Sequence, residues 1–148
     1  MKATDTPTYL ALNTYTKLMR AAESVTGRVN RSMAAFDLTI SQFGVLEALY
    51  HKGPLCQRDI AAKILKSTGN ITLVIDNLEK RGLVRRERDS EDRRYLTVRL
   101  TEEGASLIAR AYARVEAAIV AEMAVLTEEE QHMLGTLSKK LGLAKGGS

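Results

Sequence analysis

The feature that most constrains the fold of this chain is the stretch from Ser67 to Leu100, where a helical pattern is followed by a two-stranded pattern. Gly82 follows the last residue of the helical part, a place where helices commonly end with glycine in a left-handed conformation. Alternation of apolar and polar residues then predicts short strands over 83–86 and 95–100, joined by the polar loop 89–94. The helical part is recognised by apolar residues at three- and four-residue steps, which stack on one helix face: Ile71, Val74, Ile75 and Leu78.

The polar side chains of this helix–hairpin unit suit binding to DNA. The other face of the expected helix carries hydroxyl and amide groups, and the loop carries Arg93 and Arg94. Such a helix can enter a major groove while the hairpin reaches the backbone or the minor groove. Residues 57–99 hold eleven Lys/Arg against seven Asp/Glu, a net charge of +4 that equals the charge of the whole chain. A localised basic zone is typical of proteins that bind polyanions, although scattered charge on a solvated surface is the alternative.

The remaining pattern predicts one mainly α domain around the small β-hairpin. The short helix 57–65 and the helix that ends before Gly82 have the spacing of a helix-turn-helix. Thr39 with Gln42, and Thr127 with Glu130, have the spacing of capping boxes. Helices are expected over residues 9–36, 40–52, 57–65, 68–81, 102–124 and 128–141.

The hairpin and the helix before it also resemble a known family. The segment NLEKRGLVRRERDSEDRRYLTVRLTEEG is similar to the winged-helix signature of the multiple-antibiotic-resistance regulator (MarR) family of bacterial transcription factors. The similarity is specific over residues 38–104 and loose in the terminal helices, and Ser90 stands where the family often has proline. The resemblance implies a single domain spanning residues 1–148. Its winged helix-turn-helix lobe covers 38–100, flanked by helical dimerisation segments at 9–36 and 102–142.

Contacts with DNA are expected at three places. The first turns of the recognition helix should read base edges, and helix starts should meet phosphates. The resemblance implies that the last wing arginine, Arg94, enters the minor groove, and Asp92 should hold the wing arginines by a salt bridge. Simple helix caps and solvated charges are the alternatives. The expected DNA-binding residues are Ser41, Gln42, Gln57, Arg58, Lys66, Ser67, Thr68, Gly69, Asn70, Thr72, Arg86, Asp92, Arg93 and Arg94.

The terminal helices carry more apolar surface than one small domain needs. This predicts that they interlock with a second copy of the chain as a homodimer, and the family resemblance implies the same. It also implies a phenolic or lipophilic small-molecule effector bound between the dimerisation helices and the DNA-binding lobe. The residues expected there, for each of which an ordinary core role is the alternative, are Tyr15, Met19, Phe36 and Tyr50.

Cys56 stands where the third helix should have its N-cap, three residues before Asp59. A thiol is a weak cap, but a helix N-terminus favours the thiolate, so Cys56 is a candidate redox site. Family members that resemble peroxide sensors carry their cysteine near the start of the first helix, where this chain has none. The alternative is a small, partly buried residue that fills the cap position.

Several classes of function lack support in the sequence. It contains no phosphate-binding loop, dinucleotide-binding fingerprint, metal-ligand spacing or nucleophile–base–acid set, which predicts a non-enzyme without a metal or other cofactor. No apolar run approaches the roughly 20 residues of a membrane span, and no signal-peptide pattern occurs, so a cytoplasmic protein without a membrane partner is expected. The expected function is a homodimeric, sequence-specific regulator, most simply a repressor, that binds a pseudo-palindromic operator and is released by a small molecule or an oxidant. The alternatives are a winged-helix protein–protein interaction module and a nonspecific nucleoid-type DNA-binding protein.

Overall fold

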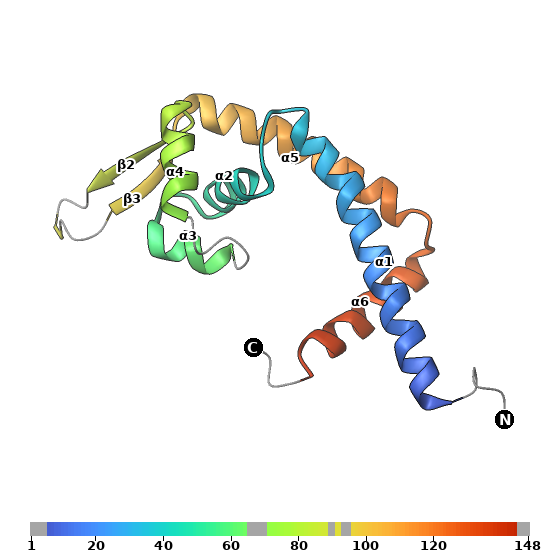
Figure 1. Cartoon of the computed structure of the whole chain (residues 1–148). Coiled ribbons are helices and arrows are strands. Elements are labelled where there is room, and N and C mark those ends of the chain that lie inside the picture. The colour runs from blue at the N-terminus through green and yellow to red at the C-terminus, as the bar shows by residue number, and fades with distance from the viewer. Residues whose placement is uncertain (1–5, 65–70, 89–90, 93–95, 145–148) are drawn as a thin grey trace.

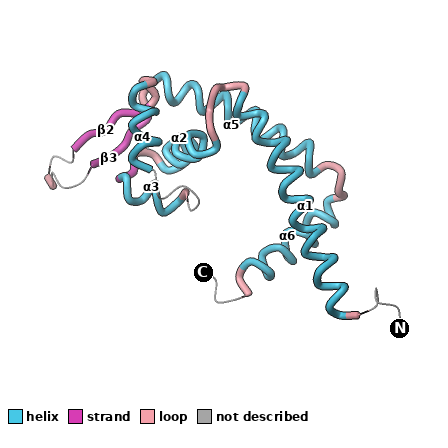
Figure 2. The backbone as a smooth tube through the Cα atoms, viewed as in Figure 1, coloured by secondary structure: helices cyan, strands magenta, loops and turns pink. Residues whose placement is uncertain are grey.

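The computed structural model describes residues 6–64, 71–88, 91–92 and 96–144. It is a mainly helical molecule with one small sheet, which confirms the expected fold class (Figures 1 and 2). Its elements in chain order are α1 (Pro7–Ala34), α2 (Ile40–Lys52), β1 (Leu55–Cys56), α3 (Gln57–Lys63), α4 (Ile71–Lys80), β2 (Val84–Arg88), β3 (Leu96–Leu100), α5 (Glu102–Met123) and α6 (Glu128–Gly142).

Local sequence signals set most of the helix boundaries. Thr39 caps α2 and Thr127 caps α6, and each forms the reciprocal capping box that its spacing predicts. Gly82 has a φ of +74°, and the backbone N–H after it donates to the Leu78 carbonyl over 3.0 Å, so α4 ends in the predicted left-handed cap. The sequence prediction for α3 was too long, because Ile64 has already left helical geometry at φ −105° and ψ 71°.

The sheet contains one strand that the sequence pattern did not predict. β2 and β3 form the expected antiparallel hairpin, with Val84 opposite Leu100. β1 pairs antiparallel with the other edge of β3, Leu55 opposite Val98, which gives the strand order β1-β3-β2. Two residues are too few for an alternating pattern to be recognised. The consequence is that the start of α3 is attached directly to the wing.

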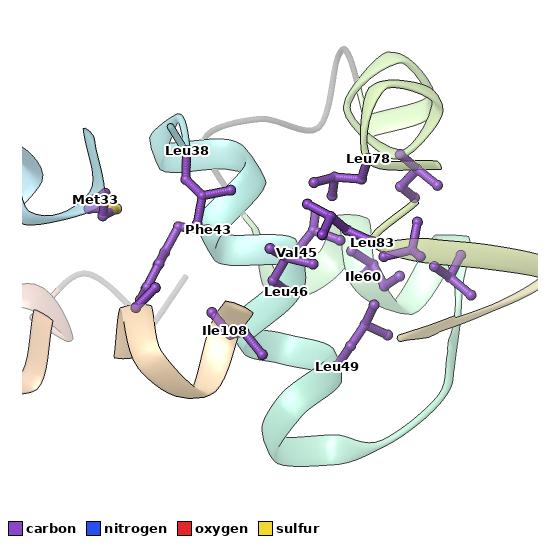
Figure 3. Close-up of a cluster of buried hydrophobic side chains, with 14 of the residues drawn as sticks. Met33, Leu38, Phe43, Val45, Leu46, Leu49, Ile60, Leu78, Leu83 and Ile108 are labelled. Carbon is purple, nitrogen blue, oxygen red and sulfur yellow. The ribbon is translucent and has the colours of Figure 1, made fainter. Parts of the chain in front are cut away.

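The core of the winged-helix lobe is apolar and lies between α2, α3, α4, α5 and the sheet (Figure 3). The α4 stripe faces inward as expected, with Ile75 and Leu78 fully buried. Leu46 of α2, Ile60 of α3 and Ile108 of α5 are also fully buried. No buried polar or charged residue occurs among the residues that the structure describes, so the lobe is held mainly by apolar burial.

The junction between the wing and α5 requires glycine at position 104. Thr101 caps α5 and also donates its hydroxyl to the Gly82 carbonyl oxygen over 2.6 Å. Gly104, in the first turn of α5, lies so close to Leu83 that an added Cβ would be 1.9 Å from the Leu83 carbonyl oxygen. Only glycine allows this approach.

Outside the lobe the molecule is open. α1 packs on α5, and the pair extends away from the sheet, with α6 beyond the end of α5 (Figure 1). Arg28 of α1 forms an ion pair with Glu122 of α5, and the hydrogen bond from Arg28 holds the pKa of the Glu122 carboxyl below its usual value. Only Val29 and Met33 of α1 are buried, and α6 contains no buried residue. None of the described helices is long and apolar enough to cross a membrane.

Candidate nucleic-acid interface

The exposed face of α4 is the natural candidate for contact with a nucleic acid. α4 follows α3 as the second helix of a helix-turn-helix, the element that enters a major groove in this docking mode. Thr72, Asn77 and Lys80 are exposed, as the sequence pattern predicts. Leu73 is also 54% exposed, and the sequence reasoning missed it because it considered only the polar residues of this face.

Hydrogen bonds from α3 and β2 fix the first described turn of α4. The Gln57 side-chain Nε2 donates to the Thr72 hydroxyl oxygen over 2.7 Å. Arg86 Nη2 donates to the Thr72 carbonyl oxygen over 3.2 Å, and Arg86 Nε donates to Gln57 Oε1 over 3.4 Å. Three residues expected to contact DNA are therefore brought together, but they contact one another.

Arg86 also binds two carboxylates on the side of α4. Its Nη1 lies 2.7 Å from an Asp76 carboxylate oxygen and 3.0 Å from a Glu79 oxygen, and its backbone N–H donates to Glu79 over 3.1 Å. The Arg86 side chain is only 16% exposed. Its guanidinium thus ties β2 to α4 and offsets the negative charge that Asp76 and Glu79 would present to a phosphate backbone. This role could not be predicted from the sequence, because the partners lie on different elements.

The wing carries further positive charge. Arg85 and Arg99 are exposed, and both lie within ion-pair distance of Glu87, at 3.9 Å and 3.3 Å. Asp92 is half-buried near the tip. The remaining DNA-binding predictions in the loop before α4 and in the wing lie outside the described residues; they are Lys66, Ser67, Thr68, Gly69, Asn70, Arg93 and Arg94.

The other predicted phosphate contacts fall in two different places. Arg58 is exposed in the first turn of α3, close in sequence to Gln57. Ser41 and Gln42 lie in the first turn of α2, where Gln42 Oε1 accepts the N–H of the N-cap Thr39 over 3.0 Å. Gln42 also lines a cavity of about 540 Å³ together with Asn77, Lys80 and Arg81. Asn77 and Lys80 lie roughly 7.5 Å and 12 Å along α4 from Thr72, and Arg81 follows the end of the helix. The structure therefore does not bring Ser41 and Gln42 to the Thr72 end.

A second cavity, of about 490 Å³, lies between α1, α2 and α5. The four residues expected around an effector are not among those that line it. Tyr15 and Met19 are exposed on the N-terminal half of α1, Phe36 packs against the core, and the Tyr50 ring contacts that of Tyr112 with centroids 6.2 Å apart. Tyr15 and Phe36 are too far apart along one chain to line one small site. The lining is mostly apolar and includes Val29, Met33, Phe43, Tyr112, Val115 and Ile119.

Cys56 occupies the N-cap of α3, as predicted, and makes no side-chain capping hydrogen bond. It is half-buried, and its backbone belongs to β1, opposite Thr97 of β3. Oxidation at this position stays a prediction. Among the described residues, no group of three or more His, Cys, Asp or Glu side chains could hold a metal ion.

Comparisons with known proteins match this architecture. The model of the MarR family matches residues 38–96, which span the winged-helix lobe. The HTH-type transcriptional regulator MhqR of Bacillus subtilis is 35% identical over 133 residues, which cover 90% of this chain and 92% of MhqR.

Two solved structures bear on binding. MepR of S. aureus in complex with DNA has a TM-score of 0.73 and 27% identity, covering 86% of this chain and 96% of MepR. BpsR of Bordetella bronchiseptica, whose DNA binding is regulated by 6-hydroxynicotinic acid, has a TM-score of 0.75 and 25% identity, covering 87% of this chain and 98% of BpsR. With the winged-helix geometry described above, these similarities show that the chain belongs to the MarR family of DNA-binding transcription regulators.

Proposed function

We propose that the protein is a homodimeric repressor that binds a pseudo-palindromic operator and is released by a small-molecule or oxidant signal. The main support for a dimer is the apolar surface that stays exposed outside the DNA-binding lobe. A dimer bound to a promoter blocks the access of RNA polymerase. Repression therefore needs only the DNA-binding surface and the dimer surface.

α6 gives the clearest reason for a second copy. Its apolar residues Leu134, Leu137 and Leu141 recur at three- and four-residue steps, so they share one face, and all are exposed. An isolated helix of 15 residues is marginal in water, since most helix stability comes from burying such a face. The N-terminal half of α1 also leaves apolar side chains in solvent, with Leu10 and Leu12 exposed above 60%. A twofold dimer that pairs these surfaces would bury both sets at once.

The twofold axis also explains a palindromic target. Two recognition helices related by the axis would enter successive major grooves, with the half-sites about one helical turn apart. The solved complex of MepR with DNA supports DNA binding by this chain by analogy. The network around Arg86 supports it physically, because a helix that reads bases must be held in a fixed orientation.

The cavity between α1, α2 and α5 is the proposed effector site. α1, α5 and α6 form the arm through which the proposed dimer would assemble. The cavity lies where this arm meets the winged-helix lobe, so an occupant could change the separation of the two recognition helices. Its apolar lining suits a phenolic or lipophilic molecule. The regulation of BpsR by 6-hydroxynicotinic acid supports small-molecule control by analogy.

The test is a footprint on the promoter region nearest the protein's own gene, repeated with candidate effectors and with peroxide. We expect two symmetric protected segments and their loss on addition of one effector. A nucleoid-type protein would protect promoter and random DNA equally, and a protein–protein interaction module would protect neither. The dimer is tested separately by light scattering, where a mass of 16.3 kDa at micromolar concentration would contradict it.

The wing assignment has its own test. Replacing both Arg93 and Arg94 with alanine should weaken operator binding and lower the slope of log affinity against log salt by about one unit for each cation removed. Arg114→Ala, at an exposed position of α5, is the matched control and should leave the slope unchanged. Equal affinity of the double variant and the parent at physiological salt would show that the wing does not contact DNA.

A further inference from the structure

The recognition helix exposes one large apolar side chain on its outer face. Leu73 is 54% exposed, whereas Ile71, Ile75 and Leu78 point into the core. The other exposed residues of α4 are polar or charged. Leu73 shares its face with Asn77, four residues on, and therefore lies at the centre of the surface that a major groove would meet.

The side chains beside Leu73 are already engaged within the protein. The Thr72 hydroxyl oxygen accepts a hydrogen bond from Gln57, and the Asp76 carboxylate is paired with Arg86. These contacts hold the helix in one orientation. They also leave Thr72 and Asp76 with less hydrogen-bonding capacity for a base edge. Leu73 projects beside them from a backbone that these contacts hold in place.

We propose that Leu73 is a specificity-determining residue that packs against the C5-methyl group of thymine in the operator. Thymine is the DNA base that presents a methyl group in the major groove, whereas the other base edges present hydrogen-bond donors and acceptors there. A leucine placed against a polar edge would desolvate it without offering a hydrogen bond, so the contact disfavours other bases at that position. The inference rests on the proposed sequence-specific binding. It adds the chemical group, the thymine methyl, that Leu73 recognises.

The probe is an operator selected from random duplex DNA by the full-length protein. Each thymine is then replaced in turn by deoxyuridine, symmetrically in both half-sites, which removes only the methyl group. For the parent protein we expect an affinity loss of roughly fourfold per methyl contact at one or two thymines of each half-site, the size expected for one buried methyl. Other thymines should be insensitive.

Three variants make the test specific to the side chain. Leu73→Ala should bind the thymine and deoxyuridine operators equally, and Leu73→Met, which keeps an apolar contact, should retain the preference. Because Leu73 is half exposed, neither change should alter the helix content. Val125→Ala is the matched control, since Val125 is 85% exposed after α5, and it should behave like the parent.

The outcomes separate this inference from the proposed function. If Leu73→Ala keeps the parent's ratio of thymine to deoxyuridine affinity at every position, or if no thymine is methyl-sensitive in the parent, the inference is wrong while specific binding stands. If Leu73→Ala instead changes the mass of the protein in solution, the leucine belongs to a protein interface. If the parent enriches no sequence at all, the proposed operator recognition fails, and the thymine contact fails with it.

Discussion

Arg86 links the wing to the recognition helix through contacts within the protein. It connects β2 to two carboxylates and one backbone carbonyl of α4, and to Gln57 of α3. Charge-assisted hydrogen bonds of this kind are stronger than neutral ones, and the low exposure of the guanidinium limits screening by water. Its contribution to DNA affinity would therefore be indirect.

The prediction for Arg86→Met is a loss of about 1–3 kcal/mol in the free energy of unfolding, because Asp76 and Glu79 lose their partner. Operator affinity should fall, whereas the salt slope should stay as in the parent, since no phosphate contact is removed. Arg85→Met is the matched control on the same strand: its side chain is 64% exposed, and its one described ion pair is 3.9 Å long. Urea denaturation and salt titrations measure both effects. A reduced slope would instead assign Arg86 to the phosphates.

Cys56 is open to an equally direct test, because its thiol leaves an N-cap position without a side-chain hydrogen bond. Cys56→Ser should stabilise the protein by about 0.5–1 kcal/mol through a better cap for α3. If the thiol also senses oxidants, the serine variant should keep binding the operator at peroxide doses that release the parent. Release of both proteins at one dose, or of neither, would make Cys56 purely structural.

At the residue scale, the sequence predicted which residues cap the helices better than it predicted which side chains bind one another. Gly82 as a left-handed cap, Cys56 as an N-cap and the two capping boxes are confirmed, because each depends on residues within a few positions of one another. The contacts of Arg86 and Gln57 were not predictable, since their partners lie 7 to 29 residues away and on other elements. For the same reason the four expected effector residues did not match the cavity that the fold forms.

At the scale of elements, the junction between the hairpin and α5 depends on a residue that the sequence reasoning used only as part of the family resemblance. Gly104 closes the lobe because α5 must start directly against the backbone of Leu83. β1 and the early end of α3 were also missed. Short segments such as these are set by tertiary contacts, whereas long helices follow from their own periodicity.

Gly104→Ala should destabilise the protein by about 3 kcal/mol or more, at the upper end of the usual range for overpacking, because the added methyl meets a backbone oxygen that cannot rotate away. Gly27→Ala is the matched control, since Gly27 lies inside α1 and, apart from its own helical turn, nothing lies within 4 Å of the added Cβ. That change should stabilise the protein by up to about 1 kcal/mol through helix propensity. Urea midpoints measured at one protein concentration decide between them. Equal midpoints for Gly104→Ala and the parent would show that α5 can start elsewhere.

At the scale of the whole molecule, the lobe and the arm differ in how they bury apolar surface. The winged-helix lobe has a closed core of its own, whereas α6 and the first half of α1 leave their apolar side chains in solvent. Both segments lie away from the lobe (Figure 1). Within one chain, only Val29 and Met33 of α1 are buried. A sequence pattern reports that a face is apolar, but it does not report whether the same chain or a second copy covers it.

The spacing of the operator half-sites gives the last prediction. In the proposed dimer the distance between the two α4 helices is set by the arm formed by α1, α5 and α6, so it cannot follow changes in the DNA. Half-site centres should lie about 10 base pairs apart, or a multiple of that, and five added base pairs would rotate one half-site to the opposite face of the duplex. Tight binding should then be lost. Ten added base pairs are the control, because they return both half-sites to one face of the duplex but leave their centres farther apart than in the original operator. A dimer that bound all three sites equally in a gel-shift titration would not have the rigid twofold geometry proposed here.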